Sequence, residues 1–401
     1  MKLTFLYDHR YILGADGKPF SLTHYNYGLF ANRYLPHFDT IDIVARCDLP
    51  LGERAHLGPG VDFVSIGTWN GAIEYFQRKS AIRNQLAKLL ATPTAVIMIV
   101  PGRLGEIARP LLLSQEIPYG VEVVGDPWGA LGPGTSRHPL RPLMRWHCTH
   151  HLKKLCRDAS CASYVTREVL QRIYPASNAS FQTHYSSIEL TRADLVDAPR
   201  QYTGSPAPHK LVCIGTMAHL YKGQDVLLDA LALCRQQIPN IQLTLVGDGV
   251  HRPSLEARTE RLGLQHCVAF LGKLPPGEAI KQQLDAADLY VLPTRGEGLP
   301  RTIIEAMARG MACLGTRVSG VPELLPEDCL VAPDNARQLA SKIVALLRDP
   351  ARMTALGAAN LQASHDYLSE ELVPRRSALY QELVYLCNKR WNIVDSARKA
   401  A

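Results

Sequence analysis

The stretch VLPTRGEGLPRTIIEAMARGMACLGTRVSGVPE, residues 291–323, combines the end of a strand, a glycine-containing loop and an amphipathic helix. Strand-forming apolar residues stop at Pro293, and the loop that follows contains two glycines. From Pro300 onward, apolar residues recur at helical spacing, and Gly310 stands where a helix C-cap belongs. We therefore predict a strand, a loop and a helix with Pro300 at its first position, where a missing N–H costs nothing.

The start of this helix predicts an anion site. Pro300 would leave the backbone amides of Arg301 and Thr302 open, and such a terminus binds phosphate. Glu297 lies just before the helix and Glu305 lies one to two turns inside it. A carboxylate is a poor neighbour for phosphate but accepts the hydroxyl groups of a sugar. The pattern favours a nucleotide sugar, with a capped surface helix carrying ordinary acidic residues as the alternative.

Seven residues separate Glu297 from Glu305 within EGLPRTIIEAMARG, and this resembles the E-x7-E signature of retaining GT-B glycosyltransferases. The chain looks most like glycosyltransferase family 4, and SGVPEL at 319–324 resembles the family's next loop. The resemblance covers residues 211–330 well and the first half weakly. It implies an α/β GT-B fold of two Rossmann-like, doubly wound domains with an interdomain cleft. In the family the first glutamate contacts the donor sugar and the second the ribose, roles that fall on Glu297 and Glu305.

A lysine in the second half matches another family position. LVCIG at 211–215 predicts a strand, and Lys222 with Gly223 precedes a clear amphipathic helix. The family's lysine at this place contacts the donor diphosphate, and a flexible ammonium suits that role. Many relatives carry an arginine directly after the glycine, where this chain has Thr216. The departure puts donor affinity in question, unless His219 or a basic residue of the first half compensates.

These patterns give one set of candidate site residues. Asp126, in GDPW, follows a strand-like run, where doubly wound sheets bind ligands, but a turn residue before Pro127 is an open alternative. We predict a catalytic group of Glu297, Lys222 and Asp126. The predicted donor-binding residues are Gly215, Thr216, Lys222, Gly247, Leu274, Glu297, Gly298, Leu299, Arg301, Thr302 and Glu305. We predict neither a metal nor a cofactor, because the donor, a UDP- or GDP-sugar, is a substrate.

The predicted elements alternate between strand and helix. Apolar runs at 3–7, 41–45, 62–66, 95–100 and 119–124 enclose helical patterns at 21–35, 72–90 and 104–115, which indicates a parallel, doubly wound sheet. Residues 192–209 are rich in Pro, Gly and Ser and read as a linker. We predict an N-terminal acceptor-side domain at 1–200 and a C-terminal nucleotide-sugar domain at 205–371. The resemblance implies that a last helix at 372–390 crosses back to the first domain.

Residues 137–157, RHPLRPLMRWHCTHHLKKLCR, hold six basic residues and no acidic one. Such a segment can lie on an anionic membrane, bind a phosphorylated acceptor, or pack as a solvated helix on the core. The same segment holds His147, Cys148, His150 and His151, with Cys156 and Cys161 following. Their spacing matches no structural zinc pattern, so the sequence predicts no zinc site there.

Composition limits the remaining possibilities. The 401-residue chain has a net charge of +7, which permits a nucleotide donor or an anionic membrane but indicates no nucleic-acid partner. Ten cysteines without a CxxC pair predict buried free thiols. Asp8 interrupts the first apolar run, and no run is long enough to span a membrane. We expect a cytoplasmic protein, with the inner face of the membrane as a peripheral site.

The sequence therefore predicts a retaining hexosyltransferase that acts on a nucleotide sugar and a glycan, lipid-linked or small-molecule acceptor. A catalytically silent, glycosyltransferase-like binding subunit is the alternative, which Thr216 favours and the intact Glu297 and Glu305 oppose. A dehydrogenase with bound NAD is disfavoured, because no G-x-G-x-x-G follows the first strand. Transfer or hydrolysis of a nucleotide sugar would separate an enzyme from a silent subunit.

Overall fold

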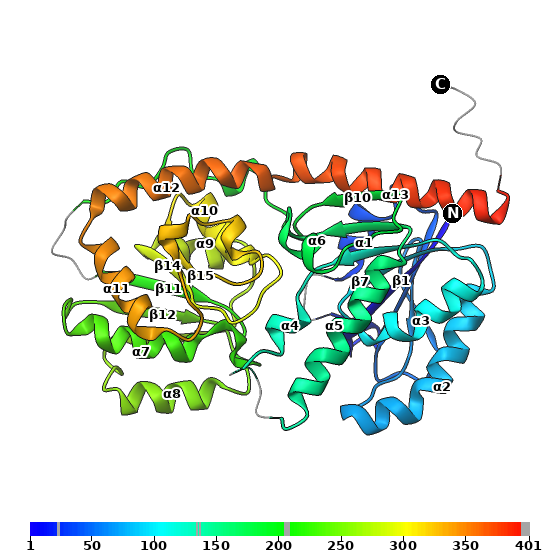
Figure 1. Cartoon of the computed structure of the whole chain (residues 1–401), viewed down its shortest axis with the longest axis horizontal. Helices are drawn as coiled ribbons and strands as arrows, with labels where there is room; N and C mark the ends of the chain where they lie inside the picture. Colours follow the sequence, from blue (N-terminus) through cyan, green and yellow to red (C-terminus); the bar gives the residue numbers. More distant parts are fainter. Residues whose placement is uncertain (22–24, 134, 136–137, 204–208, 394–401) are drawn as a thin grey trace.

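The computed structural model describes residues 1–21, 25–133, 135, 138–203 and 209–393, and it places two α/β halves side by side (Figure 1). Parts of three sequence predictions lie outside the described residues: 22–24 of the first predicted helix, Arg137 of the basic segment, and 204–208 of the linker.

The first half is built on an eight-stranded sheet in the order β10-β9-β8-β7-β1-β4-β6-β5. All neighbouring pairs are parallel except β5 with β6. The central strand β7 is buried along its whole length, which explains its unbroken apolar sequence. The strands are β1 (Lys2–Arg10), β4 (Thr40–Arg46), β5 (Arg54–Gly58), β6 (Val61–Ser65), β7 (Ala95–Val100), β8 (Tyr119–Val123), β9 (Cys161–Tyr164) and β10 (Phe181–His184).

The second half is built on a six-stranded parallel sheet in the order β13-β12-β11-β14-β15-β16. Strand order reverses around β11 and β14, so the carboxyl ends of these two strands border the crevice where such sheets bind ligands. The strands are β11 (Lys210–Ile214), β12 (Gln242–Val246), β13 (Val268–Gly272), β14 (Leu289–Leu292), β15 (Ala312–Thr316) and β16 (Leu330–Val331).

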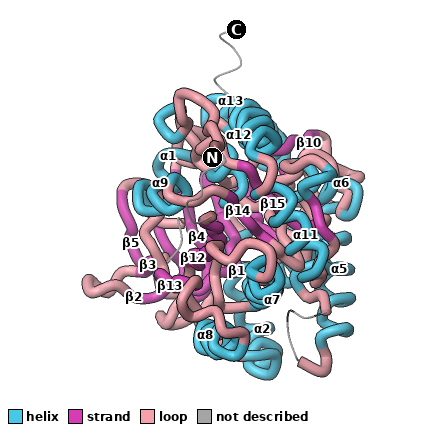
Figure 2. The backbone as a smooth tube through the Cα atoms, turned by 90° about the vertical axis from the view of Figure 1, so that its left-hand side faces the viewer, coloured by secondary structure: helices cyan, strands magenta, loops and turns pink. Residues whose placement is uncertain are grey.

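Helices surround both sheets, and the view turned by 90° shows the strands enclosed by them (Figure 2). The predicted α/β fold of two doubly wound sheets is confirmed. The helices are α1 (Tyr27–Arg33), α2 (Gly71–Leu90), α3 (Arg103–Ser114), α4 (Pro127–Ala130), α5 (Arg141–Arg157), α6 (Val169–Ile173), α7 (Gln224–Arg235), α8 (Arg252–Arg261), α9 (Glu278–Asp285), α10 (Arg301–Ala308), α11 (Ala336–Leu347), α12 (Pro350–Ser364) and α13 (Ser369–Trp391).

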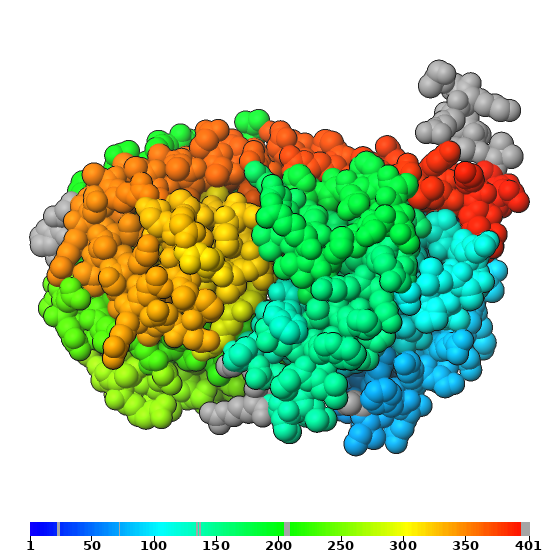
Figure 3. Space-filling model, viewed as in Figure 1, coloured from blue at the N-terminus to red at the C-terminus, as the bar shows by residue number. Residues whose placement is uncertain are grey.

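Helices α12 and α13 run one after the other along one edge of both halves (Figures 1 and 3). Helix α12 packs on α10 and β15 of the second half, whereas α13 packs on strands β7 to β10 of the first. Leu379 and Leu383 are fully buried on that face. The C-terminal helix therefore ties the two halves together, while the predicted domain limits at 1–200 and 205–371 stay a prediction.

The structure differs locally from the sequence prediction. The helix predicted at 21–35 is only α1, and residues before it form a small antiparallel hairpin of β2 (Ile12–Leu13) and β3 (Pro19–Phe20). Gly14 and Gly17 belong to the hairpin turn, where the Gly14 amide donates to the Lys18 carbonyl at 2.8 Å. Two-residue strands are too short to leave a periodic signal.

Helix α10 begins one residue later than predicted. Pro300 has an extended backbone with ψ 107° and is the N-cap residue, so the first helical residue is Arg301. Gly310 has a left-handed backbone with φ 62° directly after the helix, as a glycine at this place should. The open amides therefore belong to the first turn as predicted, with a shift of one position.

All ten cysteines are free thiols, and all but Cys148 are buried. The predicted free thiols are thus confirmed. Among the helices of the described residues, none combines the length and the apolar character needed to cross a membrane.

Candidate functional site

Lys222 and Glu297 form an ion pair at the carboxyl ends of strands β11 and β14. The Lys222 ammonium donates to Oε1 of Glu297, and the two side chains are only 11% and 13% exposed. Burial lowers the pKa of Lys222, but the neighbouring Glu297 carboxylate outweighs it, so the pKa lies above its ordinary value. The lysine is therefore charged in a sheltered place, as an anion site requires.

Backbone geometry holds Lys222 in this position. The 3-10 turn Leu220–Lys222 ends at Gly223, which has a left-handed backbone with φ 75°. A Cβ atom on Gly223 would lie 2.0 Å from the Pro293 carbonyl oxygen. A Cβ on Gly215 would lie 3.0 Å from Cγ of Lys222. Both positions therefore need glycine for the lysine stem to lie against strand β11.

Arg295 positions the same loops, and the sequence analysis did not single it out. Its guanidinium is 7% exposed and donates to Asp225 through two nitrogens, at 2.8 Å each, and to Asp334 at 2.7 Å. Its backbone amide donates to the Tyr221 carbonyl at 2.6 Å. Arg295 thus fixes the Lys222 turn against the loop that carries Glu297. A residue that acts through a buried hydrogen-bond network leaves no sequence motif, because the partners of Arg295 lie about 40 and 70 residues away along the chain.

The first turn of α10 faces the first half. Within the described residues no side chain caps this helix, and the Thr302 hydroxyl accepts from the Tyr290 hydroxyl at 2.6 Å. Arg301 lies close enough to Tyr7 of β1 to lower the pKa of that phenol, although burial raises it overall to about 12. The helix N-terminus therefore points across the cleft, where an anion could bind.

Glu305 lines a separate cavity of about 180 Å³. Residues of both halves form its wall, including Glu189, Arg301 and Gly277. Burial raises the pKa of the Glu305 carboxyl, and Arg301 only partly opposes this effect. Glu297 does not line this cavity, so the structure places the two predicted sugar-binding carboxylates in different surroundings.

The loop around Glu297 lies directly on the first half. A Cβ on Gly296 would lie 2.6 Å from the Gly129 carbonyl carbon, and one on Gly298 would lie 2.1 Å from the Val124 carbonyl oxygen. The Gly320 amide of the SGVPEL loop donates to the Gly298 carbonyl at 2.9 Å, and Leu299 is buried. Beside Glu297, the backbones of the two halves are therefore in direct contact.

Asp126 caps helix α4. Its carboxylate accepts from the amides of Trp128 at 2.9 Å and Gly129 at 3.0 Å, and it also accepts from the Tyr174 hydroxyl. The side chain is buried. These contacts match the alternative of a turn residue before Pro127, and a catalytic role for Asp126 stays a prediction.

The remaining predicted residues follow the carboxyl ends of strands β11, β12 and β13. Thr216 is exposed, and its hydroxyl accepts from the Ala218 amide at 3.1 Å. A Cβ on Gly247 would lie 1.9 Å from the Gly215 carbonyl oxygen, so this glycine permits the turn to form. Leu274 is half-buried and packs against the core between β13 and α9.

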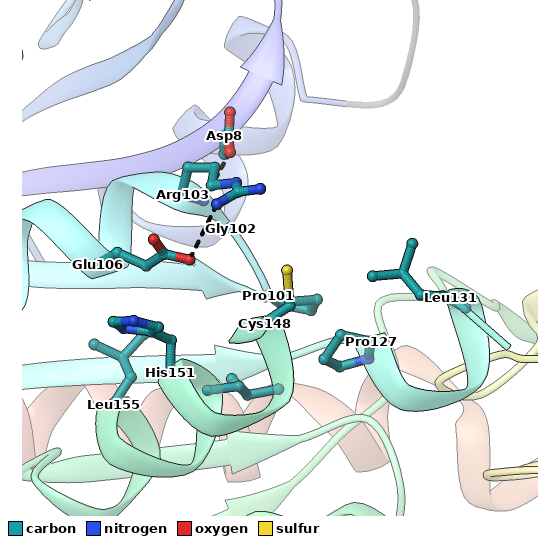
Figure 4. A pocket seen from close by; sticks show the side chains of 12 residues that line it. Asp8, Pro101, Gly102, Arg103, Glu106, Pro127, Leu131, Cys148, His151 and Leu155 are labelled. Atoms are coloured by element: carbon teal, nitrogen blue, oxygen red, sulfur yellow. Dashed lines mark hydrogen bonds and ion pairs between the residues drawn. The ribbon is translucent and has the colours of Figure 1, made fainter. Parts of the chain in front are cut away.

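A larger cavity of about 280 Å³ lies at the carboxyl ends of β1 and β7 in the first half (Figure 4). Its polar lining is Asp8, Arg103, Glu106, Cys148 and His151, and apolar side chains of α4 and α5 complete the wall. The Arg103 amide donates to Asp8 at 2.7 Å. We call it the first-sheet cavity. Apart from Asp126, whose own contacts point elsewhere, the sequence analysis proposed no site residue in this half.

Comparison with known proteins finds that this chain is similar to glycosyltransferases. Residues 208–349 match the family model described as "Glycosyl transferases group 1". Protein CapJ of Staphylococcus aureus is 26% identical over 317 residues, 78% of each chain. A GDP-mannose-dependent alpha-(1-6)-phosphatidylinositol monomannoside mannosyltransferase of Mycolicibacterium smegmatis is 25% identical, covering 73% of this chain and 82% of that one.

Solved structures share the fold. Sucrose-phosphate synthase from Thermosynechococcus elongatus superposes with a TM-score of 0.71 at 19% identity, covering 96% of this chain and 99% of that one. Anabaena HepE in complex with UDP-glucose gives a TM-score of 0.62 at 17% identity, covering 97% and 100%. Fold and relatives together define a glycosyltransferase of the GT-B fold. The resemblance to glycosyltransferase family 4 is confirmed.

Proposed function

We propose that this glycosyltransferase moves a hexose, with retention at the anomeric carbon, from a UDP- or GDP-sugar to a carbohydrate or lipid-linked acceptor. The buried Lys222–Glu297 pair at the ends of β11 and β14 carries the proposal. A charged lysine paired with Glu297, an open helix N-terminus and a second carboxylate, Glu305, in the neighbouring cavity are the set of groups that a sugar diphosphate needs.

Lys222 would exchange partners when the donor binds. In the free enzyme its ammonium is paired with Glu297, which offsets the cost of burying a charge. A donor diphosphate bound beside Lys222 and the α10 amides would replace Glu297 as the ion-pair partner of the ammonium. Glu297 could then accept hydrogen bonds from sugar hydroxyls. The exchange would give the Lys222 ammonium a charged partner both without and with the donor. It also links the predicted diphosphate contact of Lys222 to the predicted sugar contact of Glu297.

The chemistry then depends on stabilising the leaving group. As the bond from the anomeric carbon to the diphosphate oxygen breaks, negative charge grows on the diphosphate, and Lys222 with the amides of Arg301 and Thr302 would stabilise it. The departing diphosphate oxygen would accept the proton of the attacking acceptor hydroxyl on the same face of the sugar, which gives retention. We propose that no metal takes part, because these groups supply the positive charge.

Relatives support a nucleotide sugar as the donor. One relative is named as GDP-mannose-dependent, and HepE was solved with UDP-glucose. The relatives named as transferases also make a catalytically silent subunit the less supported alternative. The cavity beside Glu305 would hold the nucleoside, with its ribose on that carboxylate.

The exposed end of α5 supports a lipid-linked acceptor at a membrane surface. Leu152, Leu155 and Cys156 pack this helix on the core, but Leu143 and Trp146 near its start are 59% and 58% exposed. Basic residues alternate with these apolar side chains, the pattern of a segment that lies on anionic lipid. On this proposal, the first half approaches the inner face of the membrane by way of α5.

A ligand panel tests the proposed function. Thermal unfolding is recorded with UDP, GDP and ADP, because a ligand that binds only the folded state adds about 2.7 kcal/mol at a hundredfold excess over its dissociation constant. Release of nucleoside diphosphate from the matching sugars is then measured with glycan and lipid-linked acceptors. We expect one base to stabilise and its sugar to be consumed; stabilisation by none, together with no turnover, would refute the proposal.

A further inference from the structure

Three metal-ligating side chains gather beside the first-sheet cavity, away from the Lys222–Glu297 pair. His147 and His151 stand four residues apart on α5, so they share one helix face. Glu106 of α3 meets them from the neighbouring helix. One potential ligand atom from each residue lies within 4.8 Å of the others.

The spacing suits coordination of a metal as well as the long hydrogen bond that His147 and Glu106 form with each other. Nε2 of His147 and Oε2 of Glu106 are 3.3 Å apart. Bonds of about 2.0–2.2 Å to a tetrahedral zinc ion place neighbouring ligand atoms about 3.3 Å apart. A direct N–H···O hydrogen bond is usually near 2.9–3.0 Å. The pair is therefore separated by about the edge of a zinc tetrahedron.

The surroundings prepare the ligands for a cation. Nη1 of Arg103 lies 3.7 Å from Oε1 of Glu106, which leaves Oε2 directed at His147. Such an outer partner orients a ligating carboxylate.

Glu106 and His151 also line the first-sheet cavity, and Figure 4 shows them approaching from α3 and α5. An ion held by three protein ligands at the wall of a cavity keeps a fourth position for a small ligand, as catalytic zinc sites do. A closed structural site would need a fourth side chain. Two imidazoles and one carboxylate suit zinc, cobalt or nickel, whereas magnesium and calcium prefer oxygen ligands.

We propose that Glu106, His147 and His151 bind one zinc-class divalent ion, which joins α3 to α5 and leaves a coordination position facing the first-sheet cavity. The ion lies outside the groups to which we assign glycosyl transfer, so this proposal does not depend on the proposed function. The sequence pattern missed it because Glu106 stands 41 residues before His147.

Equilibrium dialysis of the full chain against zinc chloride tests the proposal. The protein is first treated with a chelator, and the bound zinc per chain is measured together with the thermal midpoint. The variants are Glu106→Gln, His147→Ala and His151→Ala. His150→Ala is the matched control, because His150 lies on the same helix, is exposed and stacks on Trp146 instead of joining the group.

We expect one zinc ion per chain in the wild type and in His150→Ala, with a higher thermal midpoint when zinc is present. Each ligand variant should bind zinc at least about 100-fold more weakly, since loss of an outer partner alone costs up to that much. Cobalt should give the intense visible absorption of a tetrahedral site in the wild type and in His150→Ala, but in none of the three ligand variants. Zinc binding that survives His151→Ala, or that falls equally in His150→Ala, would overturn the proposal.

A misfolded variant would not be mistaken for support. Glu106→Gln is isosteric and keeps the helix contact, so its circular dichroism spectrum and chelator-treated midpoint should match those of the chelator-treated wild type. If this folded variant binds zinc as the wild type does, or if the wild type binds none, the three residues are a hydrogen-bonded cluster and the proposal fails.

Discussion

The donor-side loops, residues 215–223 and 294–302, and the first-sheet cavity both lie at carboxyl ends of parallel strands but are built differently. In the loops, backbone packing sets the geometry: Gly223, Gly296 and Gly298 each stand where a Cβ would collide with backbone. The first-sheet cavity is instead lined by side chains from β1, α3, α4 and α5, which are far apart in the sequence.

This difference explains which amino-acid substitutions each region can tolerate. Backbone that approaches to contact distance admits almost no substitution, so the donor-side loops carry a motif that can be read from one sequence. A cavity lined by side chains from separate elements can change its lining without changing the fold. We therefore expect the donor-side loops to set the reaction and the first-sheet cavity to set which molecule is bound beside it.

The largest effect is expected at Lys222. Lys222→Ala should lower turnover at saturating donor by roughly 100-fold or more, because a charge that stabilises the leaving diphosphate is lost. Lys210→Ala is the control, since Lys210 stands at the amino end of β11, whereas Lys222 lies in the 3-10 turn beyond the carboxyl end of that strand. Turnover close to wild type in Lys222→Ala would remove the lysine from the reaction.

Gly298→Ala tests whether the two halves of the molecule are held together by backbone contact. Its Cβ would lie 2.1 Å from the Val124 carbonyl oxygen, so the loop must move, and overpacking of this kind costs about 1–3 kcal/mol. Gly28→Ala is the control, because nothing lies within 4 Å of the Cβ that would be added in α1. Denaturant unfolding should show the loss in Gly298→Ala only; equal stability of the two variants would mean that the loop is not in contact.

The two regions also differ in how much of their structure could be predicted from the sequence. Both sheets followed from alternating apolar strands and helices, Glu297 followed from its place just before a helix, and Lys222 followed from its match to a family position. Arg295 escaped notice because its partners, Asp225 and Asp334, come from distant segments. The hairpin of β2 and β3 was too short to leave a pattern, as were the single-turn helices.

For Asp126, the sequence left two roles open. Its place at the end of β8 suggested chemistry, but its hydrogen bonds to the α4 amides and Tyr174 give it a capping role. A sequence places a carboxylate at a strand end without showing which groups its oxygens accept from. For the same reason, the histidines of α5 could not be grouped until α3 supplied Glu106.

A membrane contact would sharpen the distinction between the halves, because only the first half carries the exposed α5 surface. Trp146→Glu should weaken binding to vesicles of anionic phospholipid by roughly tenfold, since an interfacial indole is replaced by an acid. Val250→Glu, at an exposed position of the second half, is the control. Sedimentation with anionic and zwitterionic vesicles measures the effect; a wild type that binds neither would leave α5 as an ordinary solvated helix.

The smallest effect is expected from removal of metal. The chain has no Asp-x-Asp pair, and the donor-side groups supply their own positive charge. Turnover at saturating donor and acceptor should therefore be unchanged by EDTA. Strict dependence on manganese or magnesium would contradict the proposed chemistry, whereas a loss restored by zinc alone would point to the Glu106 group.

The two glutamates provide the most direct test of the donor site. Calorimetric titration of Glu297→Gln and Glu305→Gln with the nucleoside diphosphate and with its sugar separates their roles, and both isosteric variants should fold. Glu305→Gln should weaken both ligands by about 1.5–3 kcal/mol, the loss of a hydrogen bond to a charged group. Glu297→Gln should leave nucleotide affinity nearly unchanged and weaken only the sugar nucleotide or its turnover. Equal loss of nucleotide affinity in the two variants would contradict the assignment of sugar to Glu297 and ribose to Glu305.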